Sequence, residues 1–170
     1  MSASEPVAPS APPAIVTTTV EIAAPPDAVF EALTDPAQLA AWWGSDETYR
    51  TRDWRLDPVA GGAWSATTVG PAGETGSLGG TFITVDAPHV LETTWRTSGD
   101  EDPSTVRWEL APTVVDGEVG TRLTVIHTGP VSHATACLAY AGFLSAMPCG
   151  MRTTDCGSVH GGRVVASRGF

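Results

Sequence analysis

One histidine in this sequence has the side chain and the predicted position of a general acid–base group. His127 ends a segment in which Leu123, Val125 and His127 alternate with more polar residues, so all three share the inward face of a predicted strand. An imidazole titrates near neutral pH, which suits proton transfer. No acidic partner for His127 is apparent in the sequence, and a histidine in such a place is more often a hydrogen-bonded core residue. We therefore predict no catalytic residue, with His127 as the candidate if there is one.

A second set of reactive residues lies near the C-terminus. Cys149, Cys156 and His160 follow one another with six and then three residues between them. Structural zinc sites usually place only two to four residues between paired cysteines. The glycines at 70–73 and 79–80 belong to a predicted hairpin turn and a strand, not to a phosphate-binding loop between a strand and a helix. We predict no metal ion and no cofactor.

Large aromatic residues are the most informative side chains in the sequence, which contains six tryptophans. Each buries a large apolar area and needs a partner for its indole N–H. Trp64, Trp95 and Trp108 fall on one face of predicted neighbouring strands. Ligand pockets are mostly apolar with a few polar groups, so these residues predict either ordinary core or a pocket for a small hydrophobic ligand. The predicted ligand-binding residues are Trp64, Phe82, Trp95, Trp108, His127, Tyr140 and Phe143.

Two short helices are predicted near the N-terminus, before the strands that carry these aromatic residues. A strand over residues 15–22 leads into a helix that begins at Pro25, Pro26 and Asp27, residue types that suit a first helical turn. Asp35 ends this helix and can cap the next, which has Pro36 at its first position. The second helix runs to about residue 43 and stops at Gly44.

A long series of strands follows. Alternation of apolar and polar residues, with turns between, predicts strands over 48–56, 62–69, 74–85, 89–96, 104–111 and 120–128. Gly79 and Gly80 predict a bulge or a close backbone approach inside one of them. The apolar segment 131–147, ended by Pro148, predicts a helix.

These elements predict an α+β fold, in which a curved antiparallel sheet carries two short helices and a long C-terminal helix covers its concave face. This is a helix-grip arrangement. Residues 1–14 are predicted to be a disordered leader because they are rich in proline, alanine and serine. The domain spans 15–148, and an irregular or disordered tail spans 149–170.

Several of these stretches resemble one known superfamily. The segment 29–44, Val-Phe-Glu-Ala-Leu-Thr-Asp-Pro-Ala-Gln-Leu-Ala-Ala-Trp-Trp-Gly, resembles the first-helix signature of the SRPBCC (START-like) proteins. The similarity continues through Gly61–Gly62, the strand pair 79–95, and the segments 106–110 and 120–127. Within the superfamily the chain resembles bacterial homologues of the C-terminal domain of the heat-shock-protein-90 ATPase activator. The resemblance implies a helix-grip fold with a cavity between sheet and helix.

Composition limits the partners. The formal net charge is −10, and all nine basic residues are arginines, so a nucleic-acid partner is not expected. No stretch reaches the length of a membrane span, and the first residues lack the features of a secretory signal. With three cysteines close together rather than a disulfide framework, a reducing bacterial cytoplasm is the expected location.

The composition changes after residue 128. Eighteen of the nineteen acidic residues lie before Gly129, whereas all three cysteines lie after it. The formal charge goes from 6 − 18 = −12 to 3 − 1 = +2 across this point. In the resembled family the C-terminal helix has a charged outer face, which this sequence lacks, although Tyr140-Ala-Gly-Phe143 can stand in for an aromatic–glycine step. The end of the chain is therefore either a native tail, a divergent one or one read out of frame.

Three functions remain open on these observations. We favour a non-enzymatic protein that binds a small apolar ligand in the predicted cavity. The resemblance implies a second interpretation, a co-chaperone-like module that binds a chaperone or another protein. The same fold also serves enzymes of the polyketide cyclase/dehydratase kind, for which His127 would be the acid–base group.

Overall fold

The structure is a computed structural model that describes residues 13–46, 49–100, 102–129, 159–160 and 163–165. Its first strand and its two helices are β1 (Ala14–Ile22), α1 (Pro26–Thr34) and α2 (Pro36–Trp42). The strands that follow are β2 (Gly44–Ser45), β3 (Tyr49–Leu56), β4 (Ala63–Val69), β5 (Thr75–Asp86), β6 (Val90–Thr97), β7 (Ser104–Val115) and β8 (Glu118–Gly129). Two short strands, β9 (Val159–His160) and β10 (Arg163–Val165), come last. The predicted order of helices and strands through residue 129 is confirmed, with the two-residue strand β2 as an addition that the sequence does not predict.

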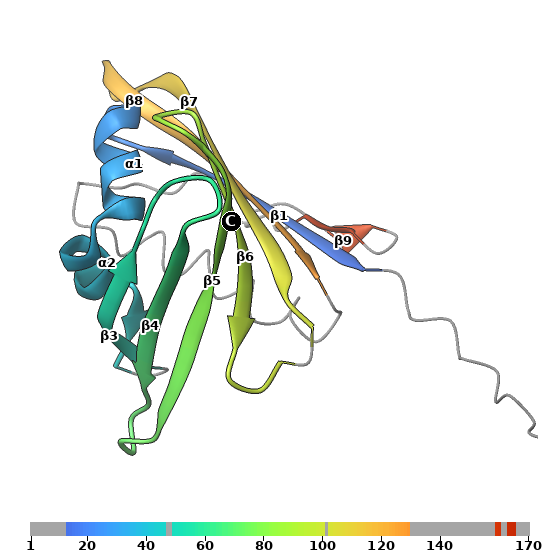
Figure 1. The fold of residues 1–170 in the computed structure, drawn as a ribbon. Coiled ribbons are helices and arrows are strands. Elements are labelled where there is room, and N and C mark those ends of the chain that lie inside the picture. Colours follow the sequence, from blue (N-terminus) through green and yellow to red (C-terminus); the bar gives the residue numbers. More distant parts are fainter. Residues whose placement is uncertain (1–12, 47–48, 101, 130–158, 161–162, 166–170) are drawn as a thin grey trace, which may run out of the picture.

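The strands form one curved sheet in the order β2-β3-β4-β5-β6-β7-β8-β1-β10-β9. Consecutive strands from β2 to β8 pair antiparallel, and β1 returns to pair antiparallel with β8. Helices α1 and α2 lie together on one side of this sheet, α2 against β3 and α1 against β7 and β8 (Figure 1). The curved antiparallel sheet with two short helices is therefore as predicted.

The hairpin of β7 and β8 is longer than its sequence pattern predicts. The predicted strand ends at Ala111 because Pro112 cannot donate a ladder hydrogen bond. In the structure Pro112 lies opposite Thr121, and the ladder continues to a two-residue turn at Asp116 and Gly117, both with positive φ. The pairing of β6 with β7 ends where Val90 lies opposite Glu109. Pro112 therefore stands where β7 has no partner on its other side, and its missing N–H costs nothing.

The junction between the two helices is set by local chemistry. The side chain of Asp35 accepts a hydrogen bond of 2.8 Å from the backbone N–H of Gln38, and Pro36 occupies the first turn of α2. This confirms the predicted cap. After α2, Gly44 has φ +95°, and a Cβ there would meet the backbone carbonyl of Tyr49. Only glycine allows the chain to leave α2 and pair at once with β3.

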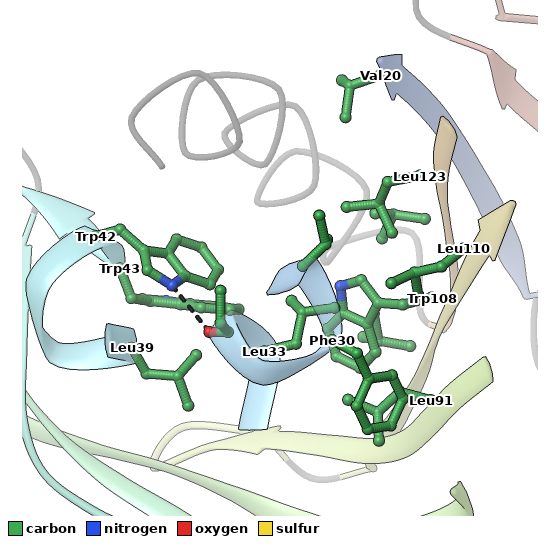
Figure 2. Packing of buried hydrophobic residues seen from close by; sticks show 14 of the residues in the cluster. Val20, Phe30, Leu33, Leu39, Trp42, Trp43, Leu91, Trp108, Leu110 and Leu123 are labelled. Atoms are coloured by element: carbon green, nitrogen blue, oxygen red, sulfur yellow. Dashed lines mark hydrogen bonds between the residues drawn. The ribbon is translucent and has the colours of Figure 1, made fainter. Parts of the chain in front are cut away.

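The core fills the space between the helices and the inner face of the sheet (Figure 2). Phe30 and Leu33 of α1 and Leu39 and Trp42 of α2 are buried there. The Trp42 indole N–H donates 3.0 Å to the backbone carbonyl of Ala32, which ties α2 to α1. From the sheet, the labelled side chains facing them are Val20, Leu91, Trp108, Leu110 and Leu123.

The predicted long C-terminal helix over 131–147 lies outside the described residues, as do Tyr140, Phe143 and the cysteines. Within 149–170, where the sequence predicts an irregular tail, the structure describes β9 and β10, and β10 pairs parallel with β1. No helix in the described ranges is long and apolar enough to cross a lipid bilayer.

Candidate functional site

An apolar hollow lies between the two helices and the inner face of β3 to β7. Its free volume is about 20 Å³, room for about one water molecule. The helices contribute two leucines to its wall, and five strands contribute the rest. The described lining residues are Leu33, Leu39, Trp54, Leu56, Trp64, Phe82, Leu91, Thr93, Trp95 and Trp108. None of these side chains carries a charge.

Four indole rings make a closed circuit beside this hollow. Trp43 lies 5.2 Å from Trp95 and Trp54 lies 6.0 Å from Trp64, both pairs stacked and measured between ring centroids. The circuit closes with Trp43 at 5.7 Å from Trp54 and Trp64 at 4.8 Å from Trp95. Contacts of this kind contribute beyond the area they bury. The circuit joins the end of α2 to β3, β4 and β6, and so fixes one wall of the hollow.

Hydrogen bonds hold these indoles in place. The Trp54 N–H donates 3.0 Å to the Thr51 hydroxyl, and that hydroxyl donates 3.1 Å to the Trp43 carbonyl. The Trp64 N–H donates 3.2 Å to the backbone carbonyl of Thr94. Gly80 allows this approach, because a Cβ there would meet both the Thr94 carbonyl and the Trp64 ring. The predicted close approach at 79–80 is confirmed, while the register shift in β5 comes later, between Phe82 and Thr84.

A β-bulge directs Trp54 toward the hollow. The register between β3 and β4 shifts between Arg52 and Arg55, and Asp53 has φ +56°. A bulge inserts one residue and re-aims the side chains beside it. Trp54 is half-buried, whereas Trp64 and Trp95 are 5% and 7% exposed. Trp54 is thus the most exposed member of the indole circuit.

Thr93 places a hydroxyl in this apolar wall. Its side chain is 3% exposed, and Thr93 Oγ1 has no hydrogen-bond partner among the residues that the structure describes. It lies on the inner face of β6, between Leu91 and Trp95, which both line the hollow as well. A buried hydroxyl without a partner is uncommon in folded proteins and costs free energy. This hydroxyl is the one orphaned polar group among the described lining residues.

His127 is inward-facing, as predicted, but is not among the described residues that line the hollow. Its Nε2 lies 2.6 Å from the Ser104 hydroxyl, which also donates 3.3 Å to the Trp95 carbonyl. A serine–histidine hydrogen bond occurs in nucleophilic catalysis. Here both side chains are buried, His127 at 4% and Ser104 at 2% exposed. The geometry is that of a buried, hydrogen-bonded polar pair.

The structure therefore brings Trp64, Phe82, Trp95 and Trp108 around one hollow. Tyr140 and Phe143, the other predicted aromatic lining residues, lie outside the described part of the chain. Sequence reasoning missed Trp54 and Thr93. The alternation that placed Trp95 inward also places Thr93 inward, so Thr93 could have been found. No feature of the sequence predicts the bulge that turns the Trp54 side chain toward the hollow.

Several charged side chains of β6 and β7 pair with one another on the outer face of the sheet. The Arg107 guanidinium is 2.7 Å from Glu109 and 3.1 Å from Glu92. The hydrogen bond that Arg107 donates to the Glu109 carboxylate is the main reason why the pKa of Arg107 is raised. Within the described ranges no group of three or more potential metal ligands occurs. The outer face offers solvated ion pairs rather than a binding centre.

Solved structures share this fold. Protein NE0264 from Nitrosomonas europaea is 21% identical, with a TM-score of 0.67 over 79% of this chain and 91% of its own. Protein Ms6760 from Mycobacterium smegmatis is 26% identical, with a TM-score of 0.59 over 76% of this chain and 81% of its own. PFC0360w, an HSP90 activator from Plasmodium falciparum, is 20% identical, with a TM-score of 0.59 over 83% of this chain and 99% of its own.

No curated protein matches the sequence. One family model does, the Activator of Hsp90 ATPase homolog 1-like protein, and the match spans residues 23–144. It continues past Gly129, so the family similarity does not stop where the composition changes. The match confirms the resemblance to the SRPBCC superfamily that the sequence indicates. The chain belongs to the Activator of Hsp90 ATPase homolog 1-like family.

Proposed function

We propose that this protein is a non-enzymatic, START-like helix-grip protein that binds a small apolar molecule on the concave side of its sheet. The observation that carries the proposal is the hollow itself, whose described wall consists of aromatic and aliphatic side chains and Thr93, none of them charged. Apolar walls with one or two polar groups are typical of small-molecule sites. A cytoplasmic location remains part of this proposal.

The volume of the hollow limits how a ligand can enter. About 20 Å³ of free space is far below the roughly 300 Å³ of a usual ligand pocket, so binding requires side chains to move. Trp54 is the side chain best placed to do so, because it is only partly buried and stands on a bulge near the sheet edge. We propose that displacement of this indole opens the hollow.

The test is a variant that fills the site. Leu56 ends β3 and lines the hollow, so Leu56→Trp adds an indole to the space a ligand needs. Val59 lies three residues on, is 54% exposed and does not line the hollow, which makes Val59→Trp the matched control. Titration with p-xylene, followed by indole N–H shifts in NMR spectra, should show binding to the wild type and to Val59→Trp. The affinity of Leu56→Trp should fall at least about 10-fold, the loss of about 1.4 kcal/mol.

Two outcomes would contradict the proposal. One is the absence of any p-xylene binding to the wild type. The other is equal binding to both variants, because the probe would then sit elsewhere. Unchanged far-ultraviolet circular dichroism of each variant is the control for folding.

A second candidate function rests on family membership. The family is described by activation of the Hsp90 ATPase, which makes a chaperone partner the alternative. Adding the purified protein to an Hsp90-type chaperone would then raise the rate of ATP hydrolysis. No change at saturating concentration would count against this alternative. The cyclase interpretation stays a prediction, since its candidate His127 is buried and is not part of the described lining.

A further inference from the structure

We infer that the ligand of the hollow carries a neutral hydrogen-bonding group, a hydroxyl or a carbonyl, and that the Thr93 hydroxyl binds it. The inference rests on the proposed function and adds the chemical class of the ligand. Two independent observations meet at this residue. The first is its place in the wall of the hollow, and the second is a buried hydroxyl without a hydrogen-bond partner in the described part of the chain.

The missing partner of Thr93 is the starting point. Thr93 Oγ1 is buried, and the neighbours of Thr93 on the inner face of β6 are Leu91 and Trp95. By contrast, the hydroxyls of Thr51 and Thr121 in the same core both donate to backbone carbonyls, at 3.1 and 2.7 Å. A buried polar group left unpaired is unfavourable unless something outside the chain completes it. Because Thr93 itself lines the hollow, a molecule bound there can supply that partner.

The surroundings decide the charge of the partner. Among the described lining residues, Thr93 alone has a hydroxyl and none carries a charge. An ionised carboxylate or ammonium group would lose its hydration there without a counter-charge. A threonine hydroxyl can both donate and accept, so it suits a phenol, an alcohol or a ketone. The walls formed by Trp54, Trp64 and Trp95 favour a flat apolar body around that group.

A single water molecule is the other candidate partner, because the free space is about 20 Å³. Such a water would have only the Thr93 hydroxyl as a polar partner among the described lining residues, whereas buried waters usually make about three hydrogen bonds. A ligand that brings its own hydrogen-bonding group replaces a poorly held water at little cost.

The test compares two probes of nearly the same shape. p-Cresol has a hydroxyl where p-xylene has a methyl group, and p-cresol is neutral at pH 7. Calorimetric titration of the full-length wild type should give tighter binding for p-cresol. Thr93→Val removes only the hydroxyl, so it should weaken p-cresol about 5- to 10-fold and leave p-xylene unchanged. Thr93→Ser keeps the hydroxyl and should keep the preference for p-cresol.

The outcomes separate this inference from the proposed function. If p-xylene binds the wild type but Thr93→Val leaves the ratio of the two affinities unchanged, the inference is overturned and the proposed function stands. If neither probe binds, both fail. Thr93→Ala serves as the second hydroxyl-free variant should Thr93→Val not fold. A preference for p-cresol that survives in Thr93→Ala would also overturn the inference.

Discussion

Burial changes the pKa of one side chain packed against this core, that of Tyr49. Its hydroxyl accepts a hydrogen bond of 3.4 Å from the indole N–H of Trp43. Tyr49, the first residue of β3, therefore helps to hold one ring of the indole circuit in place. Burial raises the pKa of Tyr49, and the Trp43 hydrogen bond only partly opposes this. The phenol is therefore held in its neutral form more firmly in the folded state than in the unfolded one.

The consequence is a loss of stability in alkali. The unfolded tyrosine releases its proton near pH 10, while the folded one holds it to higher pH. Stability from Tyr49 is complete below about pH 10 and falls as pH rises through the raised pKa. Urea unfolding between about pH 8 and pH 11 should show this decline, and Tyr49→Phe should flatten it. An equally steep decline in the variant would contradict the assignment.

Among the elements, the turn between α2 and β3 controls how the helices meet the sheet. Gly44 has φ +95°, and a Cβ there would meet the Tyr49 carbonyl. A larger residue at this position would therefore suffer both backbone strain and a steric clash. Gly73 has φ +85° but open space around it, and Gly99 has neither feature. These three glycines separate the effect of crowding from the effect of backbone conformation.

Alanine substitutions at the three glycines should therefore rank in stability. Gly99→Ala should change the free energy of unfolding by less than about 0.5 kcal/mol. Gly73→Ala should cost about 1 kcal/mol from its left-handed conformation. Gly44→Ala should cost about 3 kcal/mol or more, because the crowded carbonyl adds to the strain. Chemical denaturation of each variant gives the ranking, and equal costs at Gly44 and Gly73 would show that the crowding is relieved cheaply.

At the scale of the whole molecule, charge is the dominant surface property. The formal net charge of −10 means that acidic groups repel one another in the compact state. The described ion pairs include Arg50 with Asp46 and Arg122 with Glu21. In each pair one side chain is more than half exposed. Exposed ion pairs contribute little to the free energy of folding, so they do not offset the repulsion between the acidic groups.

Added salt should therefore stabilise the protein. Raising NaCl from about 20 to about 200 mM shortens the screening length and should raise the melting temperature. Glu118→Gln removes one exposed carboxylate from the β7–β8 turn and should reduce the dependence on salt. A melting temperature that falls with salt would mean that ion pairs, rather than net charge, dominate the surface.

The sequence alone determined the order and type of the main helices and strands through residue 129, because periodicity and capping are local. Alternation placed Trp64, Phe82, Trp95 and Trp108 on the inner face, and Asp35 marked the boundary between the helices. It also carried the resemblance to the family. The length of β7 could not be read in this way, because whether Pro112 is tolerated depends on where its neighbour β6 begins.

Only the tertiary structure decided what the inner face forms. The inward turn of Trp54 depends on a bulge in the pairing of β3 with β4, and the partnership of Ser104 with His127 depends on the register between β7 and β8. Thr93 looks like any inward threonine in the sequence. It becomes a candidate anchor because the other described residues that line the hollow are all uncharged and mostly apolar, and that is fixed by which strands lie side by side.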